Sequence, residues 1–511
     1  MHKLSKFIHE HSKKPHEYPE NELLIQSSNV ASESQDIYRH RKQRGVNLGS
    51  WFVLERWISE SPFREAKAPA QSDLDVARGN NAKQILEQHW DSWITDVDWD
   101  WIAQRGINTV RIPIGFYHIC GTNPAVLQGT DFDGLHHVFE GAWQRITCAI
   151  GAAGHRGIGV LIDLHAAPGA QNTDSHSGVS SHKVNFFTPA NMAHTTRVLA
   201  TLLGALTGFE NIVGIELLNE PHPGEHTQKL KDWYTNTIAR LRSLDAGVPL
   251  YVSDCWQTDD YAEYISALSP YDAITSVDHH LYRCFTAYDV HTSIAQHTMD
   301  LSDPNAQTPQ TFERVAKRLE PYSSAIVVGE WSGAVNPGSL QGLSSEQELG
   351  ARRAYIEAQL ALYDKHCAGN FFWTYKKEQR GDKGWSLRDA VEGGVFPDLV
   401  GRRAKYNCSG DGHRRQSSME QHQQKALGEH SEYWNQYPGN YEHWRFAEGF
   451  VRGWNEAYRF FDSSFPIVAE IGFKGAWKRR ITAEHCSRHG EEHGFDQGLA
   501  AADADFATHY L

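Results

Sequence analysis

Short apolar runs rich in β-branched residues alternate with longer helical patterns along most of this chain. The alternation begins near residue 43 and gives eight candidate strands, at 45–48, 109–114, 160–164, 213–218, 250–253, 274–277, 325–328 and 371–374. Strands separated by helices predict βαβ units and a parallel sheet. We therefore expect an α/β fold, a (β/α)8 TIM barrel with loop insertions. A doubly wound open sheet is the alternative, but no Gly-x-Gly-x-x-Gly follows the first strand, which disfavours a nucleotide-binding version.

The pattern divides the chain into four parts. Residues 1–40 form a polar N-terminal arm, and residues 41–408 form the barrel. Residues 409–424 are rich in Ser, Gly, His and Gln and are predicted to be a linker. Residues 425–511 carry aromatic residues at near-helical spacing, which predicts a mainly helical extension that packs on the barrel. A separate carbohydrate-binding surface is the other interpretation of those aromatic residues.

Composition and charge exclude several classes of partner. The net charge is −14 and no Lys/Arg-rich patch is present, so nucleic acid is not an expected partner. No apolar run has the length of a secretory signal or a membrane span. The seven cysteines are scattered without a CxxC pair, which disfavours a zinc site or a disulfide framework. We expect a cytoplasmic protein without a cofactor and without an obligate protein partner.

Polar side chains close several of the predicted strands. Catalytic groups of a (β/α)8 barrel lie at the carboxyl ends of its strands, so a polar residue at such an end is suited to a site at the barrel mouth. An acidic residue at the end of an apolar strand would be awkward in a core. Such ends and the loops after them carry Glu55, Arg111, Asp163, His165, Asn219, Glu220, Asp278, His280, Tyr282, Glu330 and Trp373.

Two carboxyl groups stand out for chemistry. Glu220 follows the fourth predicted strand, and Glu330 follows the seventh. Glycoside hydrolysis needs two such groups at the scissile bond, one to protonate the leaving oxygen and one to attack the anomeric carbon or activate water. Each glutamate alone could form a barrel-mouth salt bridge, but together, with His and Trp neighbours, they favour a glycosidase.

Seven collinear motifs resemble the fungal exo-β-1,3-glucanases of glycoside hydrolase family 5. They are RGVNLGSWFVLERWI (44–58), NTVRIPIGF (108–116), DLHAAPGAQN (163–172), GIELLNEP (214–221), DHHLYRCF (278–285), VVGEWSGA (327–334) and FFWTYKKE (371–378). The resemblance extends over residues 44–408. It implies a retaining β-glycosidase of the exo-acting β-glucosidase type, acting on a β-glucoside or β-glucan.

The resemblance also implies roles for individual residues. Glu220 would be the general acid/base and Glu330 the nucleophile, with carboxyl groups about 5 to 5.5 Å apart. Arg111 would keep Glu330 ionised, while Glu220 would have the raised pKa that a proton donor needs. The first sugar site would be formed by Glu55, His165, Asn219, His280, Tyr282 and Trp373, and Phe285 would border the second. The alternatives for Glu55 and Arg111 are a salt bridge at the core edge and an ion pair with Asp163.

The sequence departs from this family at the loop after the third strand. The glucanases carry Gly-Phe after Gln-Asn there, whereas Gln171-Asn172 is followed here by Thr, Asp, Ser and His. We therefore expect an altered leaving-group site. The family's tail cysteine corresponds to Cys408, but the sequence shows no cysteine where its partner would be expected, which supports a reduced protein.

Three other interpretations compete with a retaining glycoside hydrolase. A non-catalytic sugar-binding barrel disagrees with the presence of both glutamates. A transglycosylase would use the same intermediate, so sequence does not separate it from a hydrolase. A metal-dependent hydrolase would use Asp278, His165 and His280. Because neighbours in a strand face opposite ways, only one of His279 and His280 should point inward, and we expect no metal.

Overall fold

The described chain forms a closed barrel of eight parallel strands in sequence order, β1 to β8. This computed structural model describes residues 32–268, 273–483 and 489–511. The strands are β1 (Gln43–Asn47), β2 (Thr109–Gly115), β3 (Gly159–Ala166), β4 (Ile212–Glu216), β5 (Leu250–Ser253), β6 (Thr275–Arg283), β7 (Ile326–Val335) and β8 (Gly369–Phe372). Each overlaps the strand predicted from its apolar run, and the barrel excludes the open sheet.

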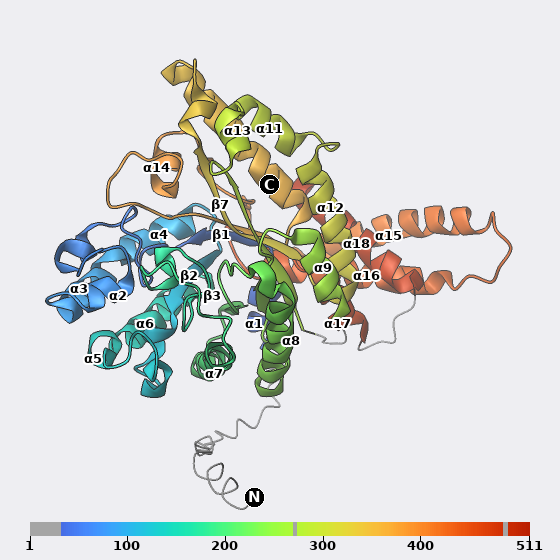
Figure 1. Cartoon of the computed structure of the whole chain (residues 1–511). Helices are drawn as coiled ribbons and strands as arrows, with labels where there is room; N and C mark the ends of the chain where they lie inside the picture. Colours follow the sequence, from blue (N-terminus) through green and yellow to red (C-terminus); the bar gives the residue numbers. More distant parts are fainter. Residues whose placement is uncertain (1–31, 269–272, 484–488) are drawn as a thin grey trace, which may run out of the picture. The chain divides into compact units, whose positions relative to one another are not determined.

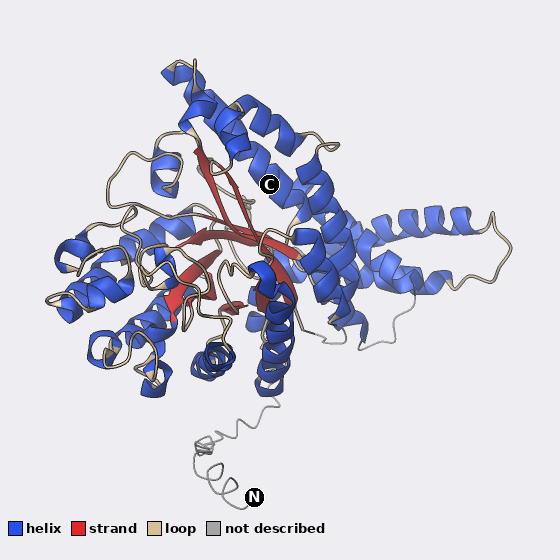
Figure 2. Cartoon of the chain, viewed as in Figure 1, coloured by secondary structure: helices blue, strands red, loops and turns tan. Residues whose placement is uncertain are grey.

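Helices surround this barrel, as the red strands and blue helices of Figure 2 show. Strands buried on both faces need such a cover, and β2, β3 and β7 are buried along their whole length. The helices up to residue 392 are α1 (Glu33–His40), α2 (Asp73–Ala77), α3 (Ala82–Trp93), α4 (Asp96–Gln104), α5 (His136–Phe139), α6 (Ala142–Gly154), α7 (Pro189–Leu206), α8 (Thr227–Leu244), α9 (Thr258–Ala267), α10 (Ala287–His291), α11 (Ile294–Ser302), α12 (Gln307–Leu319), α13 (Ser345–His366) and α14 (Leu387–Glu392).

Local sequence signals start and stop these helices. The hydroxyl of Thr188 caps α7, and Pro189 takes the first helical position, where a missing N–H costs little. Ser344 and Gln347 form a reciprocal capping box at the start of α13. Lys365 and His366 lie in its last turn, where positive charge favours the helix dipole.

The predicted N-terminal arm and the predicted linker both contain helical residues. Residues 1–31 of the arm lie outside the described residues, and 33–40 form α1. The prediction of a linker at 409–424 is wrong, because α15 begins at Gly412 and continues to Trp434. Its composition is polar because most of this helix is exposed, with Met419 as its buried residue.

The C-terminal extension consists of helices that pack on one another. They are α15 (Gly412–Trp434), α16 (His443–Asp462), α17 (Lys474–Ala483) and α18 (His489–Tyr510), shown in orange and red in Figure 1. Gly453 and Gly498 let the backbones of α16 and α18 approach closely, because a Cβ at either position would lie 2.1 Å from a carbonyl oxygen of the other helix. The buried rings of Trp454, Tyr458 and Phe506 fill the remaining space.

The extension joins the barrel at the amino ends of the strands. The backbone N–H of Lys42, just before β1, donates to the carbonyl of Glu470. Phe473 is 1% exposed and packs with Ile274, Ala368 and Tyr251, which precede or begin strands. The extension therefore closes the end of the barrel opposite the carboxyl ends of the strands, and it does not border the mouth.

Truncation of the ring that closes this end should destabilise the whole protein. We expect Phe473→Ala to lower the free energy of unfolding by about 3–5 kcal/mol, because it removes buried apolar surface and leaves a cavity. The matched control is Trp444→Ala, since Trp444 is 50% exposed. Denaturant unfolding of both variants tests this, and equal small losses would contradict the packing described.

Candidate active site

Ten residues predicted to act together do converge at the mouth of the barrel. They come from seven strands or from the loops after them, with Arg111 and Glu330 inside β2 and β7. These residues are Glu55, Arg111, His165, Asn219, Glu220, His280, Tyr282, Phe285, Glu330 and Trp373. Because parallel strands of a barrel all end at one rim, residues far apart in sequence meet there.

Arg111 lies at the centre of the group and is fully buried. Its Nη1 donates to Glu330 Oε1 at 2.8 Å, and its Nε donates to Glu216 Oε2 at 2.7 Å. Its Nη2 donates to Asn219 Oδ1 at 2.8 Å and lies 3.1 Å from Asp163 Oδ2. Both expectations for this residue therefore meet in one side chain, which pairs with Asp163 and also holds the predicted nucleophile.

The buried acids around Arg111 have perturbed pKa values. Burial raises the pKa of Asp163 to about 8, although the charge of Arg111 opposes the shift. Burial also raises the pKa of Glu216 well above its ordinary value. Burial would lower the pKa of Arg111, but Asp163, Glu216 and Glu330 outweigh it and raise that pKa. Burial therefore works against the ionised forms of Asp163 and Glu216, and Arg111 works for them.

The two candidate carboxylates face each other across a short gap. Oxygens of Glu220 and Glu330 and a nitrogen of His280 all lie within 4.8 Å of one another. Glu330 is 5% exposed and accepts a hydrogen bond from the Tyr282 hydroxyl at 2.7 Å. Glu220 has a φ of 42°, a left-handed conformation that costs a non-glycine residue free energy. Asn172 donates to its carbonyl at 3.1 Å and helps to hold it there.

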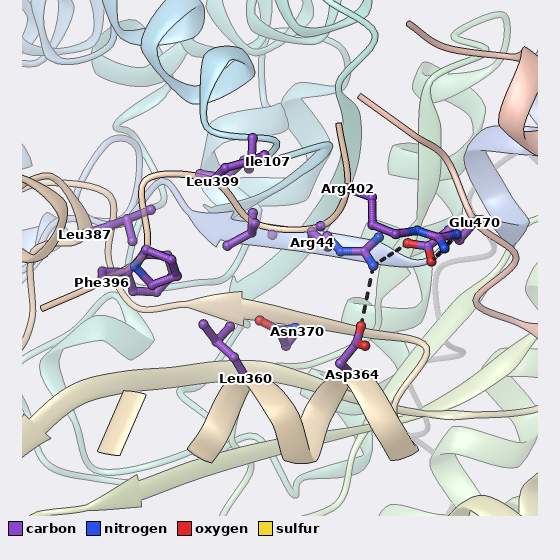
Figure 3. Close-up of a pocket in the computed structure, with 14 residues that line it drawn as sticks. Arg44, Ile107, Leu360, Asp364, Asn370, Leu387, Phe396, Leu399, Arg402 and Glu470 are labelled. Carbon is purple, nitrogen blue, oxygen red and sulfur yellow. Dashed lines mark hydrogen bonds and ion pairs between the residues drawn. The ribbon is translucent and has the colours of Figure 1, made fainter. Parts of the chain in front are cut away.

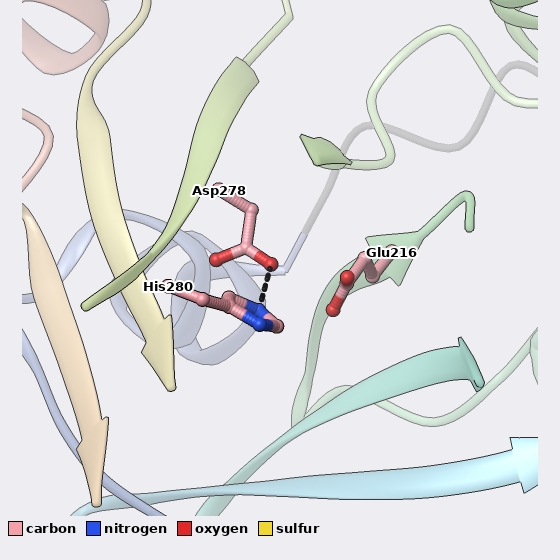
Figure 4. Close-up of side chains that lie close together, drawn as sticks. All are labelled: Glu216, Asp278 and His280. Carbon is pink, nitrogen blue, oxygen red and sulfur yellow. Dashed lines mark hydrogen bonds and ion pairs between the residues drawn. The ribbon is translucent and has the colours of Figure 1, made fainter. Parts of the chain in front are cut away.

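His280 connects the two carboxylates to a third. Its Nδ1 lies 2.7 Å from Glu220 Oε1 and 3.6 Å from Glu330 Oε2. Its Nε2 lies 3.2 Å from Asp278 Oδ2, and Figure 4 marks this contact with a dashed line. His279 points the other way and bonds Asp254 at 2.7 Å. The prediction that only one of the two histidines faces inward is confirmed.

His280 and Glu220 shift each other's pKa in opposite directions, which favours a proton on His280. Burial would lower the pKa of His280, but Glu330 and Asp278 raise it well above its ordinary value. Burial would raise the pKa of Glu220, but the hydrogen bond and charge of His280 lower it to about 2. The expectation of a raised pKa at Glu220 is therefore wrong for the ligand-free site, because sequence reasoning did not include the histidine that carries the proton.

Two groups of side chains here have the residue types of metal ligands. One is Glu216, Asp278 and His280, and the other is Glu220, His280 and Glu330. In each group His280 already bonds one carboxylate, Asp278 through Nε2 in the first and Glu220 through Nδ1 in the second. A cation would have to replace those hydrogen bonds. The expectation of a site without metal stays a prediction.

Polar and aromatic side chains form the walls of the predicted sugar site. His165 Nδ1 forms a hydrogen bond of 2.6 Å with Asp163 Oδ2. The ring of His165 stacks on that of Trp373, with the ring centroids 5.8 Å apart and an angle of 6° between the ring planes. Glu55 Oε2 accepts from the indole N–H of Trp57 at 2.8 Å. Burial raises the pKa of Glu55 to about 7. These contacts fix the orientation of groups suited to hydroxyl recognition.

Sequence reasoning missed several residues at the mouth. Trp57 and Trp385 pack edge to face at 5.3 Å, and Phe285, 71% exposed, lies 6.0 Å from Trp385. His176 lies 3.8 Å from Glu220 Oε2. The sequence does contain features that point to two of the missed residues. Glu216 is an acidic residue inside an apolar strand, and His176 lies in the loop that departs from the family pattern. Nothing in its local sequence distinguishes Trp385.

A cavity of about 250 Å³ lies elsewhere, where the extension meets the outside of the barrel. Figure 3 shows that its polar side is formed by Arg44, Asp364, Arg402 and Glu470. Arg44 pairs with Asp364 and Glu470, and Arg402 lies 2.8 Å from Glu470. The carboxylates at the mouth do not line this cavity. Within the described residues, no helix is long and apolar enough to cross a membrane.

Comparisons with known proteins place both parts of the chain. Residues 76–379 match the family model described as Cellulase (glycosyl hydrolase family 5), and residues 415–510 match the Glucan 1,3-beta-glucosidase 3 C-terminal domain. Glucan 1,3-beta-glucosidase 3 of Schizosaccharomyces pombe is 31% identical over 88% of this chain and 92% of its own length. The "Probable glucan 1,3-beta-glucosidase A" of Aspergillus fumigatus is 30% identical over 76% of this chain and 95% of its own.

The fold also occurs among solved structures. A rutinosidase from Aspergillus niger superimposes with a TM-score of 0.53 over 70% of this chain and 99% of its own, at 17% identity. At that identity the likeness concerns the barrel fold alone. The second family model begins within α15, in agreement with the helix found where a linker was expected.

Proposed function

The chain belongs to glycoside hydrolase family 5, and from that premise we propose that it is an exo-acting β-glucosidase with a retaining, two-step mechanism. Glu330 is the nucleophile and Glu220 the general acid/base. One observation supports this most strongly: the nearest oxygens of the two carboxylates lie within 4.8 Å. Retaining enzymes place their carboxyl groups about 5–5.5 Å apart, whereas inverting enzymes need about 6.5–9.5 Å to admit a water molecule.

In the first step Glu330 attacks the anomeric carbon and the bond to the leaving oxygen breaks. Arg111 and Tyr282 hold one oxygen each of Glu330, so the carboxylate is oriented before substrate arrives. Glu220 delivers a proton to the leaving oxygen. Because that proton resides on His280 in the ligand-free site, His280 supplies it through the 2.7 Å contact with Glu220 Oε1.

In the second step Glu220 acts as a base. It takes a proton from a water molecule, whose oxygen attacks the anomeric carbon and releases Glu330. His280 then recovers its proton from Glu220. The product keeps the β configuration, because two inversions at one carbon restore it.

The first sugar is glucose in this proposal. Glu55, held by Trp57, accepts from sugar hydroxyls, and the stacked rings of His165 and Trp373 supply a rigid wall. Asn219, fixed by Arg111, lies where the 2-hydroxyl would bind. The S. pombe and A. fumigatus relatives are named for glucan 1,3-β-glucosidase activity. We propose a terminal β-glucosyl residue of a β-glucan or β-glucoside as the substrate class.

The same intermediate also serves transglycosylation, in which an alcohol replaces water. Phe285, 71% exposed, offers an apolar surface beside the mouth to such an acceptor or to an aglycone. Product analysis in the presence of added alcohols separates the two outcomes. A cytoplasmic location and action without a metal stay predictions.

Substitution of each glutamate should give a distinct defect. Glu330→Gly should lower turnover by several orders of magnitude, and azide should restore activity and give an α-glucosyl azide. Glu220→Ala should do least harm with leaving groups that need no proton, such as 2,4-dinitrophenol. Rates with a series of aryl and alkyl β-glucosides test this. Equal losses on good and poor leaving groups would remove Glu220 from the acid role.

The alkaline limb of the pH profile should report His280. The pKa of His280 lies well above its ordinary value, so loss of its proton should end activity only above neutral pH. In His280→Gln the proton must reside on Glu220 alone, so the alkaline limb of kcat/KM should move to lower pH. At the optimum, kcat/KM should also fall about 10- to 100-fold, the worth of a hydrogen bond to a charged group.

The matched control is His279→Gln, on the same strand but facing Asp254 outside the site. This variant should keep the pH profile of the wild type. An alkaline limb that does not move in His280→Gln would contradict storage of the acid proton on His280.

A further inference from the structure

His176 is a second histidine beside the acid/base carboxylate, and the mechanism above does not use it. It lies in the short 3-10 helix Ser175–Ser177, in the loop after β3 that departs from the family pattern. Its Nε2 is 3.8 Å from Glu220 Oε2 and 3.8 Å from Asp174 Oδ2. Both distances exceed hydrogen-bond length, so this nitrogen faces two carboxylates without bonding either.

The rest of the ring is held in place. The side chain of His176 is 16% exposed, and its ring packs on that of His165 at 5.0 Å. Its Nδ1 is buried and has no hydrogen-bond partner among the described residues. Packing, and not hydrogen bonding, therefore sets the position of the ring, and Nε2 is the nitrogen that faces the carboxylates.

The two oxygens of Glu220 have different surroundings. Oε1 is taken by His280 at 2.7 Å, whereas Oε2 faces His176. The oxygen that exchanges a proton with substrate is therefore Oε2. A single oxygen atom can lie about 2.8 Å from both Oε2 and His176 Nε2, because these two atoms are close enough to share it.

We propose that His176 Nε2 and Glu220 Oε2 together bind the leaving-group oxygen. In this arrangement His176 donates a hydrogen bond to that oxygen. The inference rests on the proposed function and extends it to the aglycone side. It selects leaving groups that are alcohols or sugars, whose oxygen gains most from a second donor. Asp174, 57% exposed at its side chain, lies on the solvent side of the imidazole, 3.8 Å from Nε2.

The step balances without a further reactant. The bond from the anomeric carbon to the leaving oxygen breaks as the bond to Glu330 forms. His280 passes its proton to Glu220 Oε1, and a half-turn of the carboxyl group brings this proton to the side that faces His176. The leaving oxygen takes the proton there, and His176 keeps its own proton throughout. In the second step a water oxygen binds at the same position, accepts a hydrogen bond from His176, loses a proton to Glu220 and bonds the anomeric carbon as the bond to Glu330 breaks. The reverse half-turn of the carboxyl group returns the proton to His280.

The test compares His176→Ala and His176→Gln on octyl β-glucoside and 2,4-dinitrophenyl β-glucoside. With the octyl substrate, His176→Ala should lower kcat/KM about tenfold, as expected for one lost hydrogen bond. With the dinitrophenyl substrate, kcat/KM should stay within about twofold, because this leaving group needs little assistance. His176→Gln, which restores an N–H donor, should recover part of the octyl activity.

The second step gives an independent readout. Because the dinitrophenyl group leaves readily, hydrolysis of the glucosyl-enzyme is expected to limit kcat for this substrate. His176→Ala should then lower kcat and KM together while their ratio holds. A role in loop structure alone would not produce this split. The control is His182→Ala, an exposed residue of the same loop that bonds the carbonyl of Thr173.

Two outcomes overturn the inference. One is an equal loss of kcat/KM on both substrates in His176→Ala, and the other is no loss on the octyl substrate. Failure of the proposed function is a separate result, because it would appear as full activity in Glu330→Gly. The same kcat/KM measurements on the two glucosides, made for His176→Ala and for Glu330→Gly, distinguish the two failures.

Discussion

The buried guanidinium of Arg111 is the interaction on which the site depends. It binds Glu216, Glu330, Asn219 and Asn47 through hydrogen bonds of 2.7 to 2.9 Å and pairs with Asp163. These partners come from four different strands or their ends, so one side chain fixes the relative positions of much of the rim. A buried charge is costly unless every donor is satisfied, and removal of one partner leaves the other uncompensated. The barrel positions Arg111 and its acids from separate strands, and the chemistry uses the geometry that results.

A second charge, on His280, completes the site. Glu330, Asp278 and Glu220 surround its ring, and they raise its pKa where burial alone would lower it. The consequence is an acid pair, Glu220 and His280, that holds one proton between two residues. The same residue that lowers the pKa of Glu220 also supplies the proton that Glu220 delivers. Arg111 orients the nucleophile Glu330, and His280 exchanges a proton with the acid/base Glu220.

Much of this could be predicted from sequence because barrel strands are short apolar runs and their ends share one rim. Glu220 and Glu330 were found in that way, as were Arg111 and His165. Properties that depend on contacts between distant strands were not found. The pKa of Glu220 depends on His280, sixty residues away, and His176 belongs to a loop whose path no periodicity describes. The linker prediction failed for a related reason, since an exposed helix such as α15 has the polar composition of a loop.

The covalent intermediate tests the central claim most directly. A 2-deoxy-2-fluoro-β-glucosyl fluoride slows both steps but reacts through the same nucleophile, so the glucosyl-enzyme should accumulate. Digestion and mass spectrometry should locate the fluoroglucosyl group on Glu330, which Arg111 and Tyr282 hold. An adduct on Glu220 or on another residue would contradict the account. Release of the α anomer from a β-glucoside, with no adduct on any residue, would also contradict the account.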